Sequence, residues 1–180
     1  MAHKEQLEFC LKVKKKFPKL FENRKVLDVG SLDINGSNSK MFPNCLYLGI
    51  DVAPGPNVQL VCKAHELNIE NSFIDTIIST ECFEHDMYYE KSLKNIVRLL
   101  KSGGLFLFTC ATTGRPEHGT RASQPEDAPL LIEHGEWADY YKNLEEKDIR
   151  DVLDIDSIFK EYEFSTNEES KDLYFYGIKR

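Results

Sequence analysis

Short apolar runs alternate with polar or amphipathic segments through the first 110 residues, and this alternation restricts the fold more than any other feature. The runs are rich in Val, Ile, Leu and Phe, and they lie at 25–30 (KVLDVG), 45–52 (CLYLGIDV), 57–62 (NVQLVC), 74–79 (IDTIIS) and 105–110 (LFLFTC). Strands that are apolar at nearly every position are buried on both faces, as in a parallel sheet covered by helices. The sequence therefore predicts an α/β fold: a Rossmann-like, doubly wound, mostly parallel sheet with helices on both faces.

The segments between and after these runs complete the prediction. Residues 88–102 carry apolar side chains at helical spacing and stop at two glycines, which is typical of a helix terminus. A second helix is expected at 136–153. The chain then ends in two β-rich segments joined by the polar turn NEES, which predicts an antiparallel C-terminal hairpin.

The domain organisation follows from length and from two irregular regions. At 180 residues the chain has the size of one domain, and we expect a single domain over 1–180. Residues 1–24 are expected to form an N-terminal helical segment with Leu7, Cys10 and Leu11 on its apolar face. Residues 111–136 contain three prolines and three glycines, and a long irregular loop of this kind predicts a substrate-side lid.

Charge and cysteine usage restrict the partners and the compartment. The net charge of −7 disfavours a nucleic-acid partner, because a phosphate backbone is repelled on average. The five cysteines are scattered and odd in number, which favours reduced thiols over a disulfide or zinc framework. No run of 18 apolar residues and no signal peptide is visible, so we expect a cytoplasmic protein without a membrane partner.

The ligand site is expected where the strands end. In doubly wound sheets, ligands bind outside the carboxyl ends of the strands, beside the first strand. Gly30 and Ser31 follow the first run, and Asp51 follows the second, in a position to accept hydrogen bonds from ribose hydroxyls. Asp28 lies inside an apolar strand and must be paired with backbone donors or a ligand; the alternative is that it only braces the loop.

Four stretches together carry a resemblance: VLDVGS, YLGIDV, FIDTIISTECFEH and IVRLLKSGGLFLFT. Over 25–110 the chain resembles the class I S-adenosylmethionine-dependent methyltransferases, in particular the small type 11 methyltransferase domain. A dehydrogenase would instead show G-x-G-x-x-G before a long helix, which is absent here. The loop after Gly30 is about two residues longer than is usual in the family, and Lys63 or Cys62 stands where an adenine-binding acid is common.

The resemblance implies a cofactor, S-adenosylmethionine, with S-adenosylhomocysteine as product. It assigns the methionine end, the ribose, the adenine and the cavity floor to residues just after the strands. These cofactor-binding candidates are Asp28, Gly30, Ser31, Asn35, Gly36, Asp51, Val52, Ala64, His65, Thr80 and Glu81.

His85 and His118 are the leading candidates for a catalytic base, and His134 beside Glu133 is a less constrained third. A hydroxyl acceptor must lose its proton during methylation, and imidazole is the side chain best suited to take it near neutral pH. His85 follows the fourth run beside Glu84, and His118 lies on the lid. The alternatives are that His85 caps a helix or packs under the cofactor, and that His118 is a polar surface residue.

A metal site is considered but not favoured. Asp86, His118, Glu133 and His134 offer ligand types for a divalent ion, yet their spacing shows no local ligand motif. No metal ligand is therefore assigned.

The lid and the helix expected after it carry further candidates for acceptor binding. Arg115 and Arg121 offer cations for a phosphate or carboxylate on the substrate. Trp137, Tyr140 and Tyr141 suit stacking on a sugar or planar acceptor, with packing in the core as the alternative.

Together these features predict a methyltransferase of a small molecule, with O-methylation of a sugar, glycan or other small-molecule hydroxyl as the leading hypothesis. The alternatives are a carboxyl or N-methyltransferase of a small metabolite, and a non-catalytic scaffold that keeps the cofactor fold. Neither the acceptor nor the oligomeric state follows from the sequence.

Overall fold

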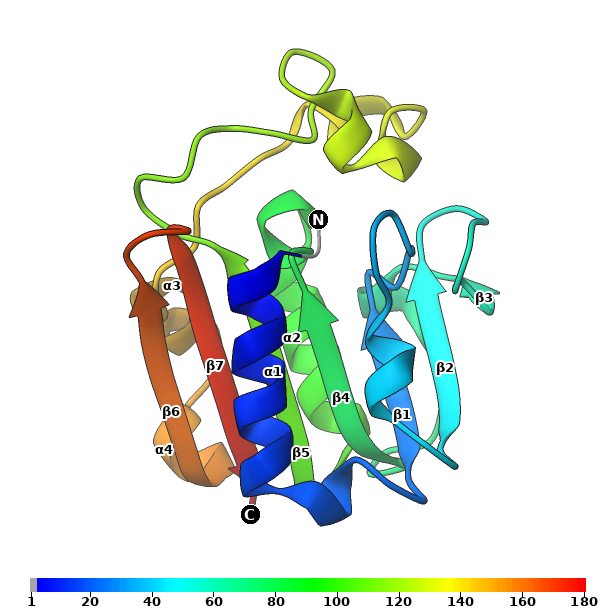
Figure 1. The fold of residues 1–180 in the computed structure, drawn as a ribbon, viewed down its shortest axis with the longest axis vertical. Helices are drawn as coiled ribbons and strands as arrows, with labels where there is room; N and C mark the ends of the chain where they lie inside the picture. The colour runs from blue at the N-terminus through cyan, green and yellow to red at the C-terminus, as the bar shows by residue number, and fades with distance from the viewer. Residues whose placement is uncertain (1–2) are drawn as a thin grey trace.

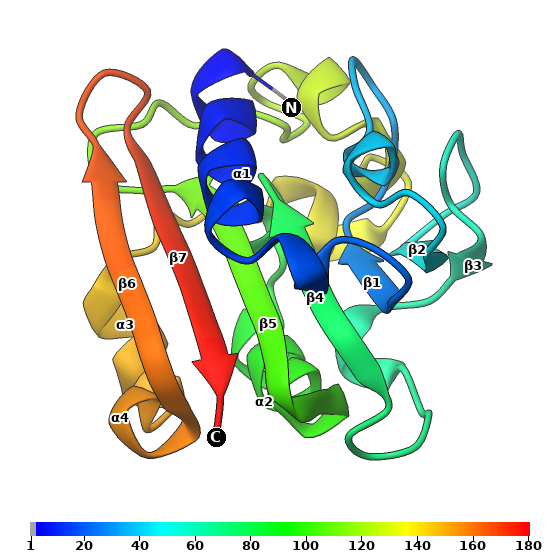
Figure 2. The same ribbon diagram turned by 60° about the horizontal axis from the view of Figure 1, so that its bottom comes forward.

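The computed structural model describes residues 3–180, which form a seven-stranded mixed sheet with helices on both faces (Figures 1 and 2). The strand order is β3-β2-β1-β4-β5-β7-β6. The strands are β1 (Lys25–Val29), β2 (Leu46–Asp51), β3 (Leu60–Val61), β4 (Ile74–Thr80), β5 (Leu100–Ala111), β6 (Phe159–Asn167) and β7 (Asp172–Lys179). The helices are α1 (Lys4–Lys16), α2 (Tyr89–Leu99), α3 (Glu146–Val152) and α4 (Ile155–Ile158).

The pairing confirms the predicted Rossmann-like fold. Strands β1 to β5 pair in parallel, whereas β7 pairs antiparallel with both β5 and β6. The C-terminal hairpin therefore closes one side of the sheet, as the sequence predicted. Helix α1 crosses one face, and α2, α3 and α4 lie on the other (Figure 1). No helix among residues 3–180 is long and apolar enough to cross a membrane.

Four sequence expectations about single elements were wrong. The helix expected to stop at Gly103 and Gly104 ends at Leu99, and both glycines lie in β5. The third strand shrinks to Leu60–Val61, because it pairs with β2 at only two positions. The helix expected at 136–153 is interrupted: a 3-10 helix at Gly135–Asp139 and α3 flank a non-helical stretch. On α1 the buried face is Gln6, Phe9, Cys10 and Val13, while Leu7 and Leu11 are about half exposed.

The lid, defined as residues 112–139, crosses above the carboxyl ends of the parallel strands (Figure 1). It contains three short 3-10 helices, at Pro125–Asp127, Pro129–Leu131 and Gly135–Asp139. The Trp137 indole donates a hydrogen bond to the carbonyl of His85, and the Lys142 amide, just beyond the lid, donates to the carbonyl of Glu84 at 2.9 Å. These bonds hold the lid against the turn that follows β4.

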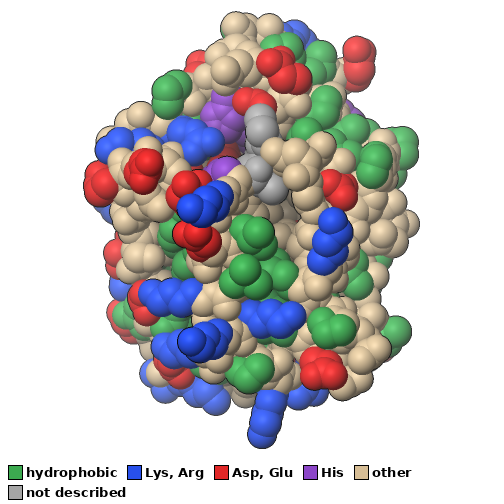
Figure 3. Space-filling view, viewed as in Figure 1, with side chains coloured by type: hydrophobic (Ala, Val, Ile, Leu, Met, Phe, Trp, Pro, Cys, Tyr) green, Lys and Arg blue, Asp and Glu red, His purple; other side chains and the backbone are tan. Residues whose placement is uncertain are grey.

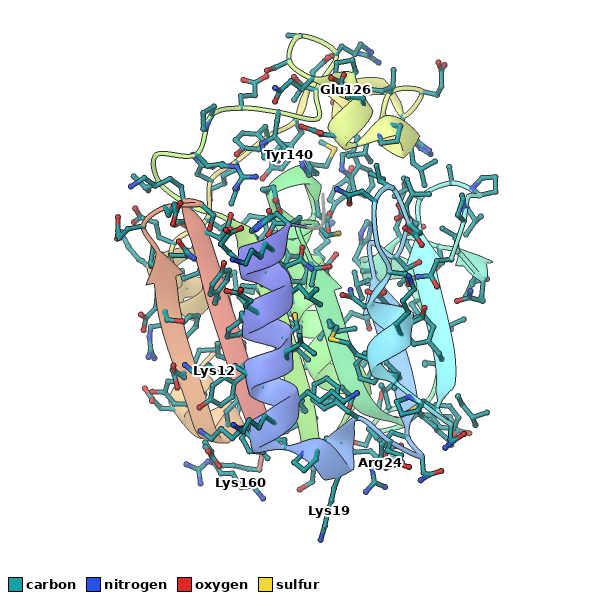
Figure 4. The ribbon with its side chains drawn as sticks, viewed as in Figure 1. Lys12, Lys19, Arg24, Glu126, Tyr140 and Lys160 are labelled. Carbon is teal, nitrogen blue, oxygen red and sulfur yellow. The ribbon has the colours of Figure 1, made fainter. Side chains whose placement is uncertain are left out.

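Many of the basic side chains lie toward the end of the molecule opposite the lid. Figure 3 shows Lys and Arg side chains gathered toward the lower end of the face that α1 covers. In Figure 4, Lys12, Lys19, Arg24 and Lys160 lie on that lower part, whereas Glu126 lies on the lid at the top. The parallel strands therefore run from this basic lower end to the carboxyl ends under the lid.

His3 attaches the start of α1 to the strand ends. Its Nε2 lies 3.0 Å from a carboxylate oxygen of Asp172 and 3.7 Å from one of Glu81. Burial by itself lowers the pKa of His3, but the hydrogen bonds and charges of Asp172 and Glu81 outweigh it and raise that pKa to about 10. An imidazolium at neutral pH thus stabilises the docked helix.

We predict that His3→Gln lowers the free energy of unfolding by about 1–3 kcal/mol near pH 6. The raised pKa means that this stabilisation is fully present below the unfolded-state pKa of His3 and is lost as pH rises toward 10. The difference between wild type and variant in urea unfolding should therefore shrink between about pH 6.5 and 10. A difference that stays constant across this range would contradict the ion cluster.

Gly30 makes the turn that ends β1 and opens the ligand side of the sheet. Its φ is +75°, a conformation that favours glycine, and an added Cβ would lie 2.5 Å from Sγ of Cys82. Gly103 has nearly the same φ, +76°, yet an added Cβ there would meet nothing within 4 Å. Comparing substitutions at these two glycines thus distinguishes the cost of backbone strain from the cost of steric overlap.

We predict that Gly103→Ala lowers the free energy of unfolding by about 1–2 kcal/mol, the cost of the left-handed backbone alone. Gly30→Ala should lose a further 1–3 kcal/mol or so, because the new methyl overlaps Cys82. Equal losses for the two variants in urea unfolding would show that Gly30 and Cys82 are not in contact.

Candidate functional site

A cavity opens at the carboxyl ends of β1, β2 and β4, under the lid. It lies at the switch point of the sheet, where β2 and β3 lie on one side of β1 and β4 lies on the other. Its volume is about 940 Å³, including the space at its mouth. Ten predicted cofactor-binding residues line it: Asp28, Gly30, Ser31, Asn35, Gly36, Asp51, Val52, Ala64, Thr80 and Glu81. Their contacts with a cofactor stay a prediction.

His65 differs from the other candidates, because it is not part of the cavity lining. Its ring instead packs against Tyr88, with the ring centroids 4.6 Å apart. Lys63 and Cys62, which stand where an adenine-binding acid is common in the family, both line the cavity.

Asp28 joins strand, loop and cavity. It is 1% exposed, accepts a hydrogen bond from the Tyr47 hydroxyl, and lies 3.4 Å from the side-chain amide of Asn38. Burial raises the pKa of Asp28 to about 7, against the opposing effect of these two donors. Asn38 also donates to the Thr80 hydroxyl at 3.0 Å. Asp28 therefore braces the loop after β1 and also forms part of the cavity wall.

Asp51 anchors that same loop from β2. One carboxylate oxygen accepts from the amide of Leu32 at 3.1 Å, and the other accepts from the amide of Val52 at 2.8 Å. Burial is the main influence on its carboxyl group and raises the pKa of Asp51. The carboxylate is thus held in place at the cavity edge by backbone donors.

The unusual LDIN loop, 32–35, lines the open cavity rather than filling it. The Asp33 amide donates to the carbonyl of Pro56 at 3.0 Å, and the Asp33 carboxylate accepts from the amide of Gly36 at 2.8 Å. Ser31 is tied to the neighbouring loop, because its hydroxyl donates to the carbonyl of Asn57 at 3.0 Å. These bonds hold the loop at the cavity wall.

The lid supplies an apolar wall of the cavity. The sequence predicted this loop but not which of its residues line the cavity. Its contribution to the cavity consists of Asp127, Ala128, Pro129, Leu130, Leu131 and Trp137. The run APLLI was the available signal, since three apolar residues in an otherwise polar loop must cover something. Which of these residues contact the cavity could be identified only from the folded structure.

The cavity is acidic. Its ionisable lining consists of five carboxylic residues, one lysine and one histidine: Asp28, Asp51, Glu81, Asp86, Asp127, Lys63 and His85. Arg115 and Arg121, considered as cations for a phosphate or carboxylate on the substrate, do not line the cavity. Arg115 pairs with Asp172 at 2.9 Å, and Arg121 pairs with Asp139 at 2.5 Å. Both guanidinium groups therefore stabilise the fold rather than line the cavity.

The two candidate catalytic histidines meet at the edge of the cavity. Their ring centroids are 5.0 Å apart and nearly perpendicular, and the Tyr141 ring packs against both. His85 lines the cavity, whereas His118 lies behind it. Burial is the main cause that lowers the pKa of both rings, that of His85 to about 3. Both imidazoles are therefore neutral at pH 7.

Glu84 joins the two histidines, which the sequence did not indicate. The residue is 0% exposed, and burial together with nearby Glu81 raises the pKa of its carboxyl group. Glu84, His85 and His118 each offer one ligand atom within 4.8 Å of the others. The set considered from the sequence differs, because among the described residues Asp86, Glu133 and His134 belong to no such cluster. Asp86 instead accepts from the Tyr88 amide and the Ser92 hydroxyl.

Comparison with known proteins gives a family match and several structural matches. Residues 27–108 match the model of a methyltransferase domain. Among curated proteins, none matches the sequence at a significant level.

Three solved structures illustrate the similarity of fold. Phosphoethanolamine N-methyltransferase 2 from Haemonchus contortus, solved with phosphomonomethylethanolamine and S-adenosylhomocysteine, is 16% identical with a TM-score of 0.64; the match covers 96% of this chain and 52% of that one. The present chain thus spans about half its length. The 1,6-didemethyltoxoflavin-N1-methyltransferase from Burkholderia thailandensis is 13% identical with a TM-score of 0.60 and coverages of 99% and 92%. The YcgJ protein from Bacillus subtilis is 14% identical with a TM-score of 0.62 and coverages of 97% and 98%.

The family match falls on β1 to β5, the strands that build the cavity, and the fold agrees with it over nearly the whole chain. Residues 27–108 thus match a methyltransferase domain, and the fold around them is similar to those of the three solved structures.

Proposed function

We propose that this chain binds S-adenosylmethionine in the cavity and methylates a hydroxyl group of a neutral small molecule, such as a sugar. The observation that supports this most is the position of Asp51 at the end of β2, on the wall of a cavity at the switch point. Ligands of open α/β sheets bind at that point, and an acid there accepts hydrogen bonds from ribose hydroxyls.

The residues around the cavity fit this cofactor. Asp51 would hold the ribose, Val52 and Ala64 would contact the adenine, and Gly30 with Ser31 would shape the methionine end. The acidic lining suits a ligand with a positive charge. When bound, the cofactor supplies a methyl group on a positively charged sulfur. The open cavity beside the LDIN loop argues against a scaffold that has lost the pocket.

The charge of the cavity also restricts the acceptor. Among the described residues of the lining, an anionic acceptor would face carboxylates with Lys63 as the one lysine or arginine to oppose them, and like charges that lose water on binding are costly. A neutral acceptor avoids this cost, which disfavours the carboxyl methyltransferase alternative. Holding the acceptor in line with the methyl group can contribute up to about 7–11 kcal/mol toward the barrier.

A hydroxyl acceptor also needs a group that takes or neutralises its proton. Unpaired polar atoms of Glu84, His85 and His118 gather on one side of the cavity, and Glu81 in the lining has one unpaired oxygen. We therefore place the acceptor hydroxyl on the His85 side of the cavity, under Trp137 and the lid.

N-methylation of a small amine is the second candidate, and the same acidic lining favours it. Carboxylates attract an ammonium ion, and the similar Haemonchus and Burkholderia proteins are N-methyltransferases. The two candidates differ in the atom that is methylated, so product analysis separates them.

We predict that calorimetry detects binding of S-adenosylhomocysteine and that Asp51→Asn weakens it by at least tenfold. The loss of charge-assisted hydrogen bonds, each about 1.5–3 kcal/mol, sets this magnitude. Asp151→Asn, an exposed carboxylate on α3, is the matched control and should leave the affinity unchanged. Equal affinity in wild type and Asp51→Asn, or no binding at millimolar ligand, would contradict the proposal.

The methylated atom is identified by incubating the protein with a labelled methyl donor and a panel of neutral sugars, small amines and small carboxylic acids. Labelled methyl ethers support the proposal, and labelled N-methyl products support the second candidate. Labelled methyl esters would contradict the inference drawn from the charge of the cavity.

A further inference from the structure

The cluster of Glu84, His85 and His118 holds buried polar atoms that lack partners among the described residues. Both ring nitrogens of His85 and Nε2 of His118 have no hydrogen bond, and the Glu84 carboxylate has the backbone amides of Glu84 and Ala111 near it, neither in good hydrogen-bond geometry. The three side chains are 0%, 5% and 4% exposed. A buried polar group left unpaired costs about 1–3 kcal/mol, and native proteins pair nearly all of them. Five such atoms in one place indicate a missing ligand.

The atoms point into a common space. One ligand atom from each residue lies within 4.8 Å of the other two. Metal–ligand bonds of about 2.0–2.2 Å place neighbouring ligands of a tetrahedral site about 3.4 Å apart. Side-chain rotations that move the ligand atoms by little more than an ångström therefore bring them to coordinating distance.

The tautomer of His118 fits metal binding. Its Nδ1 lies 3.0 Å from the carbonyl oxygen of Pro116, so this nitrogen carries the proton and donates it. The lone pair of the ring then lies on Nε2, which is the unpaired atom in the cluster. A backbone carbonyl that fixes a histidine in this way is the usual support of a metal ligand.

The lid is shaped to approach His85 closely. Gly119, next to His118, has φ of +67°, and an added Cβ would lie 2.6 Å from Cε1 of His85. Only glycine lets the backbone carrying His118 come this near to the turn that carries Glu84 and His85.

We propose that Glu84, His85 and His118 form a binding site for one divalent transition-metal ion beside the methyl-transfer cavity. Two imidazoles and one carboxylate suit Mn²⁺, Fe²⁺, Co²⁺ or Zn²⁺ better than Mg²⁺ or Ca²⁺, which prefer oxygen ligands throughout. Three protein ligands leave coordination positions open, as in catalytic sites.

The role of the ion deepens the proposed function and rests on it. Because His85 also lines the cavity, an ion in the cluster lies next to the place assigned to the acceptor. A bound divalent ion stabilises negative charge on an oxygen and makes a hydroxyl more acidic. The ion also joins the lid, through His118, to the turn after β4.

A second cluster differs because charged partners surround it, although Nε2 of His3 and one carboxylate oxygen of Glu81 also lack a hydrogen bond there. His3, Glu81 and Asp172 also bring possible ligand atoms together. Glu81, however, accepts a hydrogen bond from Thr109, Asp172 pairs with Arg115, and His3 lies against both acids. This cluster is an ion-pair network and needs no metal.

The test is a titration of the EDTA-treated protein with Co²⁺, monitored by visible absorption and calorimetry. We expect one equivalent to bind, with Mg²⁺ binding at least tenfold more weakly. Glu84→Gln and His118→Ala should each weaken Co²⁺ binding by at least a hundredfold. His134→Ala, a lid histidine outside the cluster, is the matched control and should bind Co²⁺ like wild type.

Two further measurements distinguish a loss of metal binding from a loss of folding. In the metal-free protein Glu84→Gln removes a buried acid without a hydrogen bond in good geometry, so its melting temperature should equal or exceed that of wild type. In wild type, Mn²⁺ should broaden the NMR signals of the His85 and His118 rings and spare those of His134. This second measurement needs no variant.

The proposal is overturned if millimolar Co²⁺ and Mn²⁺ do not bind, if the cluster variants bind like wild type, or if Mg²⁺ binds more tightly than Co²⁺. Binding of S-adenosylhomocysteine is measured separately in the same samples. Metal binding without cofactor binding would contradict the proposed function and keep the site, and the reverse result would remove only the site.

Discussion

The burial of acidic side chains at the carboxyl ends of the parallel strands is the constraint on which the rest of this structure depends. A buried carboxylate must be paired or lose its charge. Asp28 is paired by Tyr47 and Asn38, and Asp51 by two backbone amides. These bonds fix the loops that form the cavity. The buried carboxylate of Glu84 lacks such a partner, and this identifies the cluster of Glu84, His85 and His118 beside the cavity.

This arrangement links the electrostatics of the cavity to its chemistry. Carboxylates around the cavity favour a cationic cofactor and a neutral or cationic acceptor. The guanidinium groups of Arg115 and Arg121, which would reverse this preference, are paired with other acids of the fold. The lid adds an apolar cover, and Trp137 anchors it to the backbone of His85. The acidic cavity and the apolar cover of the lid thus lie together at the carboxyl ends of the strands.

Much of the fold was predictable from the sequence, because buried parallel strands are continuous apolar runs. β1, β2 and β4 lie within a residue or two of their expected positions, and most cofactor-site candidates follow from the rule that ligands bind where such strands end. Elements governed by tertiary contacts were harder. The face of α1 was misassigned, since Phe9 stacks on Tyr174 at a centroid distance of 4.7 Å, a partner far away in the sequence.

The cluster beside the cavity shows why the rest of the site could not be predicted. Glu84 and His85 are neighbours in the chain, but His118 joins them only because Gly119 lets the lid approach. No local spacing encodes such a meeting. The ion pair of Arg115 could not be predicted for the same reason, because its partner Asp172 lies far along the chain, at the start of β7.

The central claim is that a nucleoside binds at the carboxyl ends of β1 and β2, against the LDIN loop. An NMR titration of the labelled protein with S-adenosylhomocysteine tests this most directly, since it locates the ligand without requiring an acceptor. The backbone amides of residues 30–36 and 51–52 should show the largest chemical-shift changes. Changes concentrated away from these strand ends, or no changes at millimolar ligand, would contradict the claim.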